Sequence, residues 1–188
     1  AERKRSSMKV APTAIPDVLI IAPKVFGDDR GFFYESFHQN AFNEATGQSL
    51  NFVQDNHSRS AKGVLRGLHY QILQPQGKLV RVVKGAVFDV AVDIRKGSST
   101  LGKWVGFELS EDNRLQMWVP PGFAHGFLVT SRSADLLYKA TDYYAPQHER
   151  CIMWNDADIA VKWPLDHEPL LSAKDRAGQL LMNAEKFA

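Results

Sequence analysis

The chain has 188 residues, of which 44% are apolar and 23% are charged, a balance that is typical of a folded globular protein and excludes a disordered chain. Its 23 Lys and Arg residues nearly balance its 21 Asp and Glu residues. Residues 1–7, which precede Met8, read as a remnant of an expression vector, and without their three basic residues and one acidic residue 20 of each sign remain. A chain without a basic surplus is a poor general nucleic-acid binder, so we expect no nucleic-acid partner.

The length fits one domain, which we place at residues 8–188. Cys151 is the one cysteine, so no intrachain disulfide can form, and a reducing cytoplasm is the expected location. The longest apolar run near the start, residues 18–22, is too short for a secretion signal and far shorter than the ~20 residues of a spanning helix. We therefore expect no membrane partner.

In chain order, the first predicted elements are short strands and one short helix. The strands cover residues 18–21, 32–37, 52–56 and 64–71, and a turn rich in Gly and Asp lies at residues 27–31. The helix covers residues 38–46, buries Phe42 and Ala45, and ends at Gly47.

An alternating pattern is clearest in the middle of the chain. Residues 78–83 and 87–94 are predicted as strands joined by a turn, and in the second strand one face is fully apolar while the other carries Asp89 and Asp93. Further strands are predicted over residues 103–109, 115–119, 126–130, 136–141 and 151–154, and a C-terminal helix over residues 173–187. Many short strands separated by turns indicate an all-β sandwich or barrel, and a jelly roll offers a usable interior.

Two of the six histidines stand in contexts that suggest chemistry. On a strand, His69 lies on the face opposite Leu68 and Tyr70, beside Gly67, which leaves room for a side chain that faces a cavity. The alternative interpretation is a structural histidine that is exposed or hydrogen-bonded. The pattern alone leaves both interpretations open.

His125 completes a Pro-x-Gly-x-x-His spacing, which is similar to the second motif of cupins, jelly rolls that often hold a metal. The usual first cupin motif supplies two histidines and a glutamate, whereas only His69 stands at the matching place. Two histidines without a nearby carboxylate make a poor metal site, so we expect no metal. We predict a cupin-type jelly roll, or double-stranded β-helix, with a few short helices, in which side chains do the acid–base work.

Asp175 and Tyr138 each have two interpretations. Asp175 stands at capping-box spacing from Ser172, or it supplies the carboxylate that orients His69 and raises its basicity. Tyr138 alternates with Leu137 and Lys139, so it belongs to the core or places a phenol in the cavity as a proton donor. The sequence spacing does not decide between them.

Basic residues in the first half of the chain suit a pyrophosphate, and aromatic residues near them suit a stacked base. The alternative is ordinary surface charge and core aromatics. The residues concerned are Arg30, Arg59, Arg66, Lys78 and Arg81, and Phe26, Phe32, Phe33 and Tyr34.

Seven motifs together resemble the dTDP-4-dehydrorhamnose 3,5-epimerase family. They follow one another without large gaps at residues 27–35, 52–58, 65–71, 76–81, 87–95, 121–127 and 171–175. The resemblance implies a cupin jelly roll, no cofactor, and a homodimer that exchanges N-terminal strands. It also implies a dTDP-linked 4-keto-6-deoxyhexose as the substrate.

The same resemblance implies roles for individual residues. His69 is similar to the general base and Asp175 to its partner, Tyr138 to the acid on the opposite face of the sugar, and Lys78 to the cation that steadies the oxygen at C4. Some of the residues that match substrate-binding positions would reach the partner subunit's site. These residues are Arg30, Glu35, Gln54, Asn56, Arg66, Lys78, His125, Glu149 and Lys174.

The implied reaction converts dTDP-4-dehydro-6-deoxy-D-glucose to dTDP-4-dehydro-L-rhamnose by inverting C3 and C5. One alternative is a related enzyme that inverts C3 alone, which the motifs do not separate from the first. A second is a non-enzymatic sugar-nucleotide sensor, which has no need for a base. A third is a metal-dependent cupin oxygenase, which the missing ligands disfavour.

Overall fold

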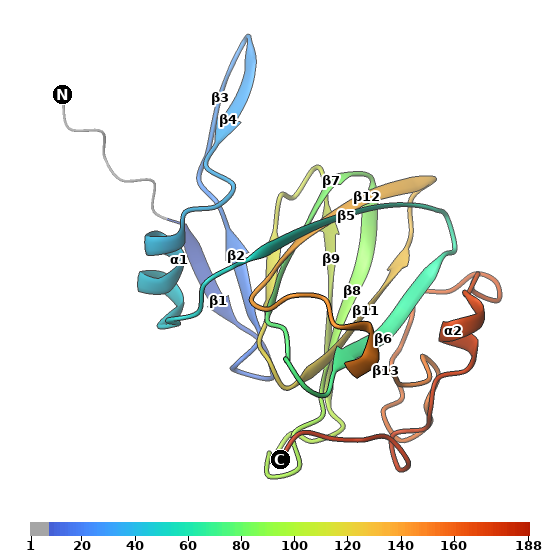
Figure 1. Cartoon of the computed structure of the whole chain (residues 1–188). Helices are drawn as coiled ribbons and strands as arrows, with labels where there is room; N and C mark the ends of the chain where they lie inside the picture. The colour runs from blue at the N-terminus through green and yellow to red at the C-terminus, as the bar shows by residue number, and fades with distance from the viewer. Residues whose placement is uncertain (1–7) are drawn as a thin grey trace.

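The computed structural model describes residues 8–188 as two antiparallel sheets that face each other (Figure 1). The first sheet has the order β1-β2-β10-β7-β12-β5, with β1 (Lys9–Pro12), β2 (Leu19–Ala22), β5 (Gln54–Ala61), β7 (Lys78–Lys84), β10 (Gln116–Val119) and β12 (Ser133–Ala140). The second has the order β13-β6-β11-β8-β9, with β6 (Leu65–Gln71), β8 (Ala86–Asp93), β9 (Trp104–Ser110), β11 (Phe123–Val129) and β13 (Glu149–Cys151). The predicted all-β jelly roll is confirmed.

A two-stranded hairpin, β3 (Val25–Asp28) and β4 (Gly31–Tyr34), projects away from both sheets (Figure 1). The sequence pattern predicts neither β3 nor β1, since each is four residues long, pairs with a single neighbour and contains Gly or Pro. The prediction for residues 1–7 lies outside the described residues.

The two faces of β8 are buried in different places. Val87 and Ala91 point between the sheets and pack against β7 and β12, through residues such as Val80 and Leu136. The fully apolar face packs outward against the C-terminal part of the chain, through Val90, Val92, Ile159, Leu181 and Ala184. Because this outer layer covers the apolar face, the face that carries Asp89 is the one that points into the jelly roll.

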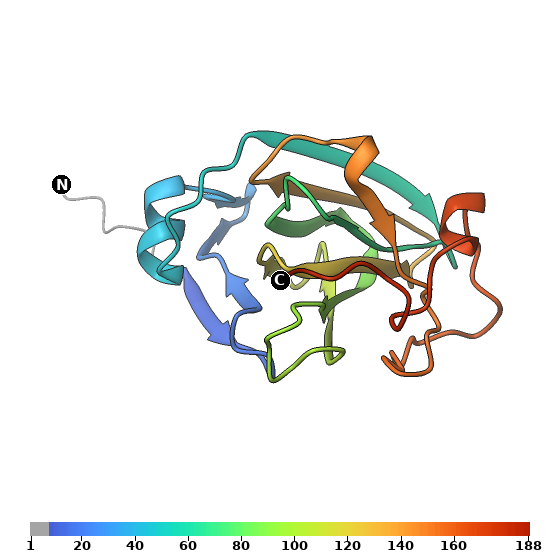
Figure 2. The same ribbon diagram turned by 60° about the horizontal axis from the view of Figure 1, so that its bottom comes forward.

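The predicted helix over residues 38–46 is confirmed as α1 (Gln39–Thr46). It buries Phe42 as predicted, but the prediction that Ala45 is buried is wrong, because Ala45 lies on the exposed side. Its first turn is capped by His38, whose ring Nδ1 accepts the backbone N–H of Ala41 at 3.2 Å, and it ends at Gly47 with φ +70°. Figure 2 shows α1 at one end of the molecule and α2 at the other. Neither helix of the described chain has the length and apolar character that crossing a membrane requires.

The predicted helix over residues 173–187 is wrong beyond its first turn, because α2 spans only Ala173–Arg176. After it, no continuous run of helical hydrogen bonds follows, and several backbone groups bond to distant segments. Gln179 N–H donates to Cys151 O at 2.9 Å, and Phe187 N–H donates to Ile94 O at 3.1 Å. A short 3-10 helix at Pro146–His148 is the remaining helical element of the described chain. Tertiary pairing thus overrides a weakly helical apolar spacing.

Candidate active site

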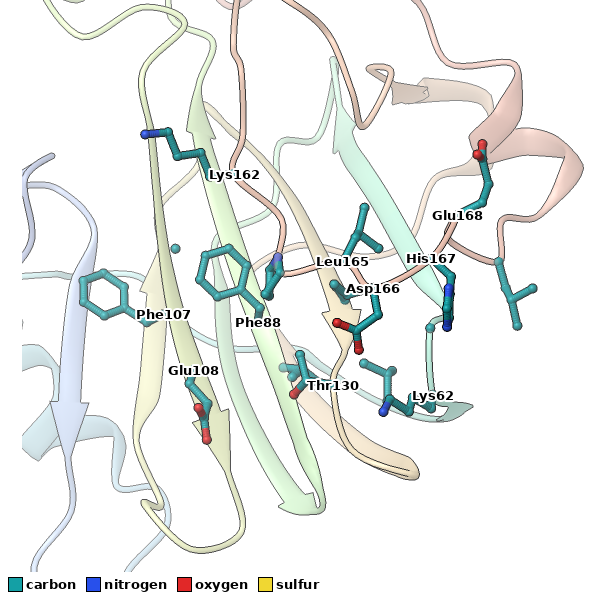
Figure 3. Close-up of a pocket in the computed structure, with 17 residues that line it drawn as sticks. Lys62, Phe88, Phe107, Glu108, Thr130, Lys162, Leu165, Asp166, His167 and Glu168 are labelled. Carbon is teal, nitrogen blue, oxygen red and sulfur yellow. The ribbon is translucent and has the colours of Figure 1, made fainter.

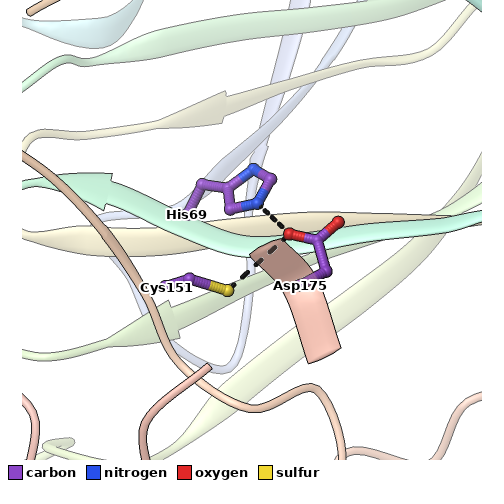
Figure 4. Close-up of side chains that lie close together, drawn as sticks. All are labelled: His69, Cys151 and Asp175. Carbon is purple, nitrogen blue, oxygen red and sulfur yellow. Dashed lines mark hydrogen bonds and ion pairs between the residues drawn. The ribbon is translucent and has the colours of Figure 1, made fainter. Parts of the chain in front are cut away.

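An imidazole and a carboxylate that are 106 residues apart in the sequence meet where α2 packs on β6. His69 Nε2 lies 2.5 Å from Asp175 Oδ1 (Figure 4). The Ser172 side chain accepts the backbone N–H of Asp175 at 3.1 Å, so it caps the helix while the carboxylate turns to the histidine. The backbone N–H of Asp175 thus takes part in the Ser172 cap, while its carboxylate bonds to His69.

Asp175 is buried, with 3% of its surface exposed. Burial raises the pKa of its carboxyl group, but the hydrogen bond and charge of His69, with further bonds from the Gly67 backbone and Ser172, outweigh that effect and hold the pKa below its ordinary value. The group is thus an ionised carboxylate at neutral pH, fixed against one ring nitrogen. A carboxylate in that position selects the tautomer with the proton on Nε2 and leaves Nδ1 to accept a proton.

The predicted facing of His69 holds. Leu68 and Tyr70 pack into the outer apolar layer, and His69 is paired across the ladder with His125 of β11. Gly67 serves a different purpose from the predicted one of making room for His69. A Cβ at Gly67 would lie 2.6 Å from Gly126 Cα, and its φ is +126°, so the close approach of β6 and β11 requires glycine.

Lys78 and Tyr138 lie together on the facing sheet, where β7 pairs with β12. The Lys78 ammonium is 5.4 Å from the centroid of the Tyr138 ring, and Lys78 is 8% exposed. Burial lowers the pKa of Lys78 to about 8, although the charges of Glu149 and Asp89 act in the opposite direction. Burial raises the pKa of Tyr138, and a hydrogen bond with Asn56 partly opposes it. At neutral pH the site thus contains a desolvated cation beside a protonated phenol.

Glu149 connects the two sheets electrostatically. It forms an ion pair with Lys174, and its Oε2 accepts a hydrogen bond from the Tyr144 hydroxyl at 2.8 Å. Its charge raises the pKa values of Lys78 and Tyr138. Burial raises the pKa of Glu149 itself, but Lys174, Tyr144 and His69 together outweigh burial and hold that pKa below its ordinary value. Lys78, Tyr138 and His69 therefore all interact electrostatically with Glu149, and we call this set one electrostatic neighbourhood.

A second histidine–aspartate pair is fully buried. His125 Nε2 lies 2.7 Å from Asp89 Oδ1, and the side chains are 6% and 0% exposed. Among the described residues, Asp89 Oδ2 has no hydrogen-bond partner. Asp89 is not among the predicted site residues, although an acid on the strand of residues 87–94 is a visible signal. His69 and His125 thus bind carboxylates from different elements.

The remaining predicted residues lie either in the strands around this cluster or at the β3–β4 hairpin. Gln54 and Asn56 lie on β5 and bond to each other at 3.1 Å, and Asn56 stands opposite Tyr138 in the ladder. Arg66 Nε donates to Ser60 Oγ at 3.0 Å. The structure does not bring Arg30 to this cluster, because it lies at the tip of the β3–β4 hairpin, 90% exposed and bonded to Asp28. Glu35 follows directly after β4.

Two other predicted anion ligands, Arg59 and Arg81, and the aromatic residues lie elsewhere. Arg81 is on the face of β7 opposite to Lys78. Arg59 Nε donates to Asp135 at 2.8 Å on the face of β5 that is turned away from Asn56. Phe32 stacks on Tyr34 on the hairpin, with ring centroids 5.9 Å apart. Phe32 and Phe33 are 62% and 73% exposed, so the hairpin aromatics are not core residues of this chain.

A cavity of about 1000 Å³ lies on the outer side of β8 and β9, beneath residues 162–170 (Figure 3). Phe88, Phe107 and Leu165 form part of its apolar wall, and Lys62 and Asp166 are among its charged residues. None of the predicted site residues is among the described residues that line it. The titratable cluster, rather than this cavity, is the candidate active site.

Comparison with known proteins agrees with this geometry. A family model described as dTDP-4-dehydrorhamnose 3,5-epimerase matches residues 12–183. The enzyme of that name from Pseudomonas aeruginosa is 62% identical over 180 residues, covering 96% of this chain and 99% of the relative. The crystal structure of dTDP-6-deoxy-D-glucose-3,5-epimerase from Legionella pneumophila in complex with dTDP-4-keto-L-rhamnose is 55% identical, with a TM-score of 0.93 and 95% of each chain covered.

A 3'-monoepimerase from Streptomyces bikiniensis in complex with dTDP-quinovose also shares the fold. It is 34% identical, with a TM-score of 0.86, and covers 91% of this chain and 87% of its own. The fold alone thus does not separate one inverted centre from two. The family model, however, matches most of the chain, and the relative that is 62% identical carries the same family description. The chain therefore belongs to the dTDP-4-dehydrorhamnose 3,5-epimerase family.

Proposed function

We propose that the protein is an isomerase that inverts C3 and C5 of dTDP-4-dehydro-6-deoxy-D-glucose, giving dTDP-4-dehydro-L-rhamnose in dTDP-L-rhamnose biosynthesis, without a cofactor. Family membership supports the reaction. The observation that carries the mechanism is the His69–Asp175 pair, which shares an electrostatic neighbourhood with Lys78 and Tyr138.

The base of the proposed reaction is Nδ1 of His69. The C4 ketone acidifies the hydrogens on C3 and C5, and removal of either gives an enolate. Asp175 holds the proton on Nε2 and stabilises the imidazolium that forms when Nδ1 takes the carbon-bound proton. In Figure 4 the second ring nitrogen of His69 points away from Asp175, which leaves it free of that carboxylate.

Lys78 supplies the charge that an enolate requires. A cation that is already buried stabilises a developing oxyanion strongly, because little solvent screens it and its position is fixed before the reaction. We assign it to the oxygen at C4. Its lowered pKa, about 8, still leaves the ammonium form predominant at neutral pH.

Tyr138 supplies the proton on the other face of the sugar. Inversion requires a donor opposite the base, and the raised pKa of the Tyr138 phenol keeps it protonated at neutral pH. It lies on β12 of one sheet, whereas His69 lies on β6 of the other, which suits two groups that act on opposite faces of one ring.

For substrate binding we propose the polar residues around this centre, which are Gln54, Asn56, Arg66, His125, Glu149 and Lys174. Arg30 and Glu35 would act in the second subunit's site of a homodimer that exchanges N-terminal strands. The projecting β3–β4 hairpin supports this, because it carries Arg30 together with the exposed Phe32 and Phe33. We further propose that residues 8–188 work as a single domain and in the cytoplasm, where one unpaired cysteine is ordinary.

The test is incubation of the protein with the 4-keto sugar nucleotide in deuterium oxide, followed by NMR of the product. Two labels, at C3 and C5, with inversion at both, are expected. A single label at C3 would identify a C3-only epimerase, and no label would identify a sugar-nucleotide sensor. A size measurement in solution, repeated on a Phe32→Ser/Phe33→Ser variant, tests the dimer, which the variant should weaken.

A further inference from the structure

Cys151 lies directly beside the histidine–aspartate pair. It ends β13 and is paired with His69 across the β13–β6 ladder. Its Sγ lies 3.7 Å from Asp175 Oδ1, the same oxygen that lies 2.5 Å from His69 Nε2 (Figure 4). Among the residues that the structure describes, these three form the one group of His, Cys and acidic side chains whose ligand atoms gather closely, all within 4.8 Å of one another.

We propose that His69, Cys151 and Asp175 form a binding site for a thiophilic divalent cation, best matched by Zn²⁺, and that its occupancy switches off the base. The site would be inhibitory, and it uses an ion that the proposed reaction does not require. The binding itself stands on the geometry alone, whereas the loss of activity rests on the proposed function.

The donor set fits Zn²⁺ in both chemistry and spacing. One nitrogen, one sulfur and one oxygen are ligands that Zn²⁺ accepts in tetrahedral sites, and three protein ligands leave a fourth position open. Bond lengths of about 2.0–2.3 Å place tetrahedral donors roughly 3.5 Å apart. The present separations, from 2.5 Å up to at most 4.8 Å, need to change by only about an ångström.

The three ligands are held by different but fixed elements. The β13–β6 ladder sets the backbones of Cys151 and His69, and the Ser172 cap sets that of Asp175. Asp175 is buried and Cys151 is half-buried, so water competes weakly for the ion once it is bound. A hard cation such as Mg²⁺ finds one oxygen here, which is too few for its octahedral preference.

Binding exchanges protons for the metal without any change of oxidation state. Burial, reinforced by Asp175, raises the pKa of the Cys151 thiol to about 12, so the metal-free protein carries the S–H form. A Zn–S bond forms as this proton leaves to solvent, and the hydrogen bond between His69 and Asp175 breaks.

The tautomer of His69 explains the inhibition. Zn²⁺ binds the Nε2 lone pair, so the proton that Nε2 carried in the free protein has to move to Nδ1. Nδ1 then becomes an N–H donor and no longer accepts a proton from carbon. The buried His125–Asp89 pair serves as an internal comparison, because among the described residues it forms no such group with a thiol.

The experiment titrates the full chain with Zn²⁺ by calorimetry and with Cd²⁺ by ultraviolet absorption, which reports thiolate-to-metal charge transfer. We expect one ion per chain with the charge-transfer band, no binding of Mg²⁺, and at least a tenfold weaker Zn²⁺ affinity with loss of the band in Cys151→Ser. Asp175→Asn, whose shape is conserved, should also weaken Zn²⁺ binding while retaining the thiol. Circular dichroism establishes that both variants are folded.

Inhibition is measured separately, with each protein compared with its own metal-free rate. Zn²⁺ should inhibit the unaltered protein at concentrations at least tenfold below those that inhibit Cys151→Ser. Equal affinity in both proteins, or binding without the charge-transfer band, would overturn the metal site. Binding at Cys151 in a protein that incorporates no deuterium would leave the metal site standing and refute the proposed function instead.

Discussion

Replacing Asp175 with asparagine tests the dyad most directly. The substitution keeps the side-chain shape and the backbone N–H that Ser172 accepts, so the cap of α2 should persist. It removes the negative charge that faces His69 Nε2 at 2.5 Å. The new amide can also donate to Nε2, which would place the ring proton on Nδ1, the nitrogen that we assign as the base.

The structure sets the size of the effect. A hydrogen bond to a charged group contributes about 1.5–3 kcal/mol, and the imidazolium forms only as the carbon-bound proton is removed. Loss of that contribution in the transition state alone lowers kcat by about 10- to 150-fold, and the wrong tautomer lowers it further. Because Asp175 is buried behind His69 rather than exposed to ligand, KM should change by less than about threefold.

The assay follows the wash-in of solvent deuterium at C3 and C5 by NMR, over a range of substrate concentrations. Asp112→Asn is the matched control, because it makes the same change at an exposed turn after β9 and should keep the unaltered rate. A wild-type kcat for Asp175→Asn, or a loss that lies wholly in KM, would refute the orienting role of the carboxylate.

Four further predictions concern three other residues of the cluster. His69→Ala should lose turnover while retaining its circular dichroism spectrum and melting transition; substantial residual turnover would remove His69 from the role of base. Tyr138→Phe should still exchange hydrogen for deuterium but should invert the labelled carbons poorly, so unchanged epimerisation would contradict the assignment of the acid. Because the folded-state pKa of Lys78 is lowered from 10.5 to about 8, its cation is present below that pH, and kcat should fall as the pH rises through 8. Between about pH 8 and pH 10.5, unfolded chains bind a proton at Lys78 that folded chains have released, so the contribution of Lys78 to the free energy of unfolding should rise with pH. The contribution is measured as the difference from Lys78→Met in denaturant titrations. A contribution that falls over this pH range would contradict the burial of the charge.

The class of the fold and most strands follow from local patterns in the sequence, because a side-chain period of two is a local property of the chain. Residues 87–94 show this well: the alternation predicts a strand with one apolar face, and β8 covers Ala86–Asp93. The same locality explains α1, where a capping residue, a buried aromatic and a terminal glycine stand within ten residues.

Which face of β8 points inward, and where α2 ends, depend on tertiary packing. The apolar face is covered by residues from the C-terminal part of the chain, which leaves Asp89 to face the interior and bind His125. The pairing of Gln179 with Cys151 ends the helical pattern that the local spacing favours. Both outcomes depend on segments that meet only after the chain has folded.

The site shows the same division. The sequence indicated the chemistry of His69 and Asp175 but left each with a second interpretation, since no local signal spans the 106 residues between them. Cys151 carried no signal at all, because its neighbour is set by the register of β13 on β6. The sequence specifies the types of residue that are present, whereas packing sets the distances between them, and acid–base chemistry needs both.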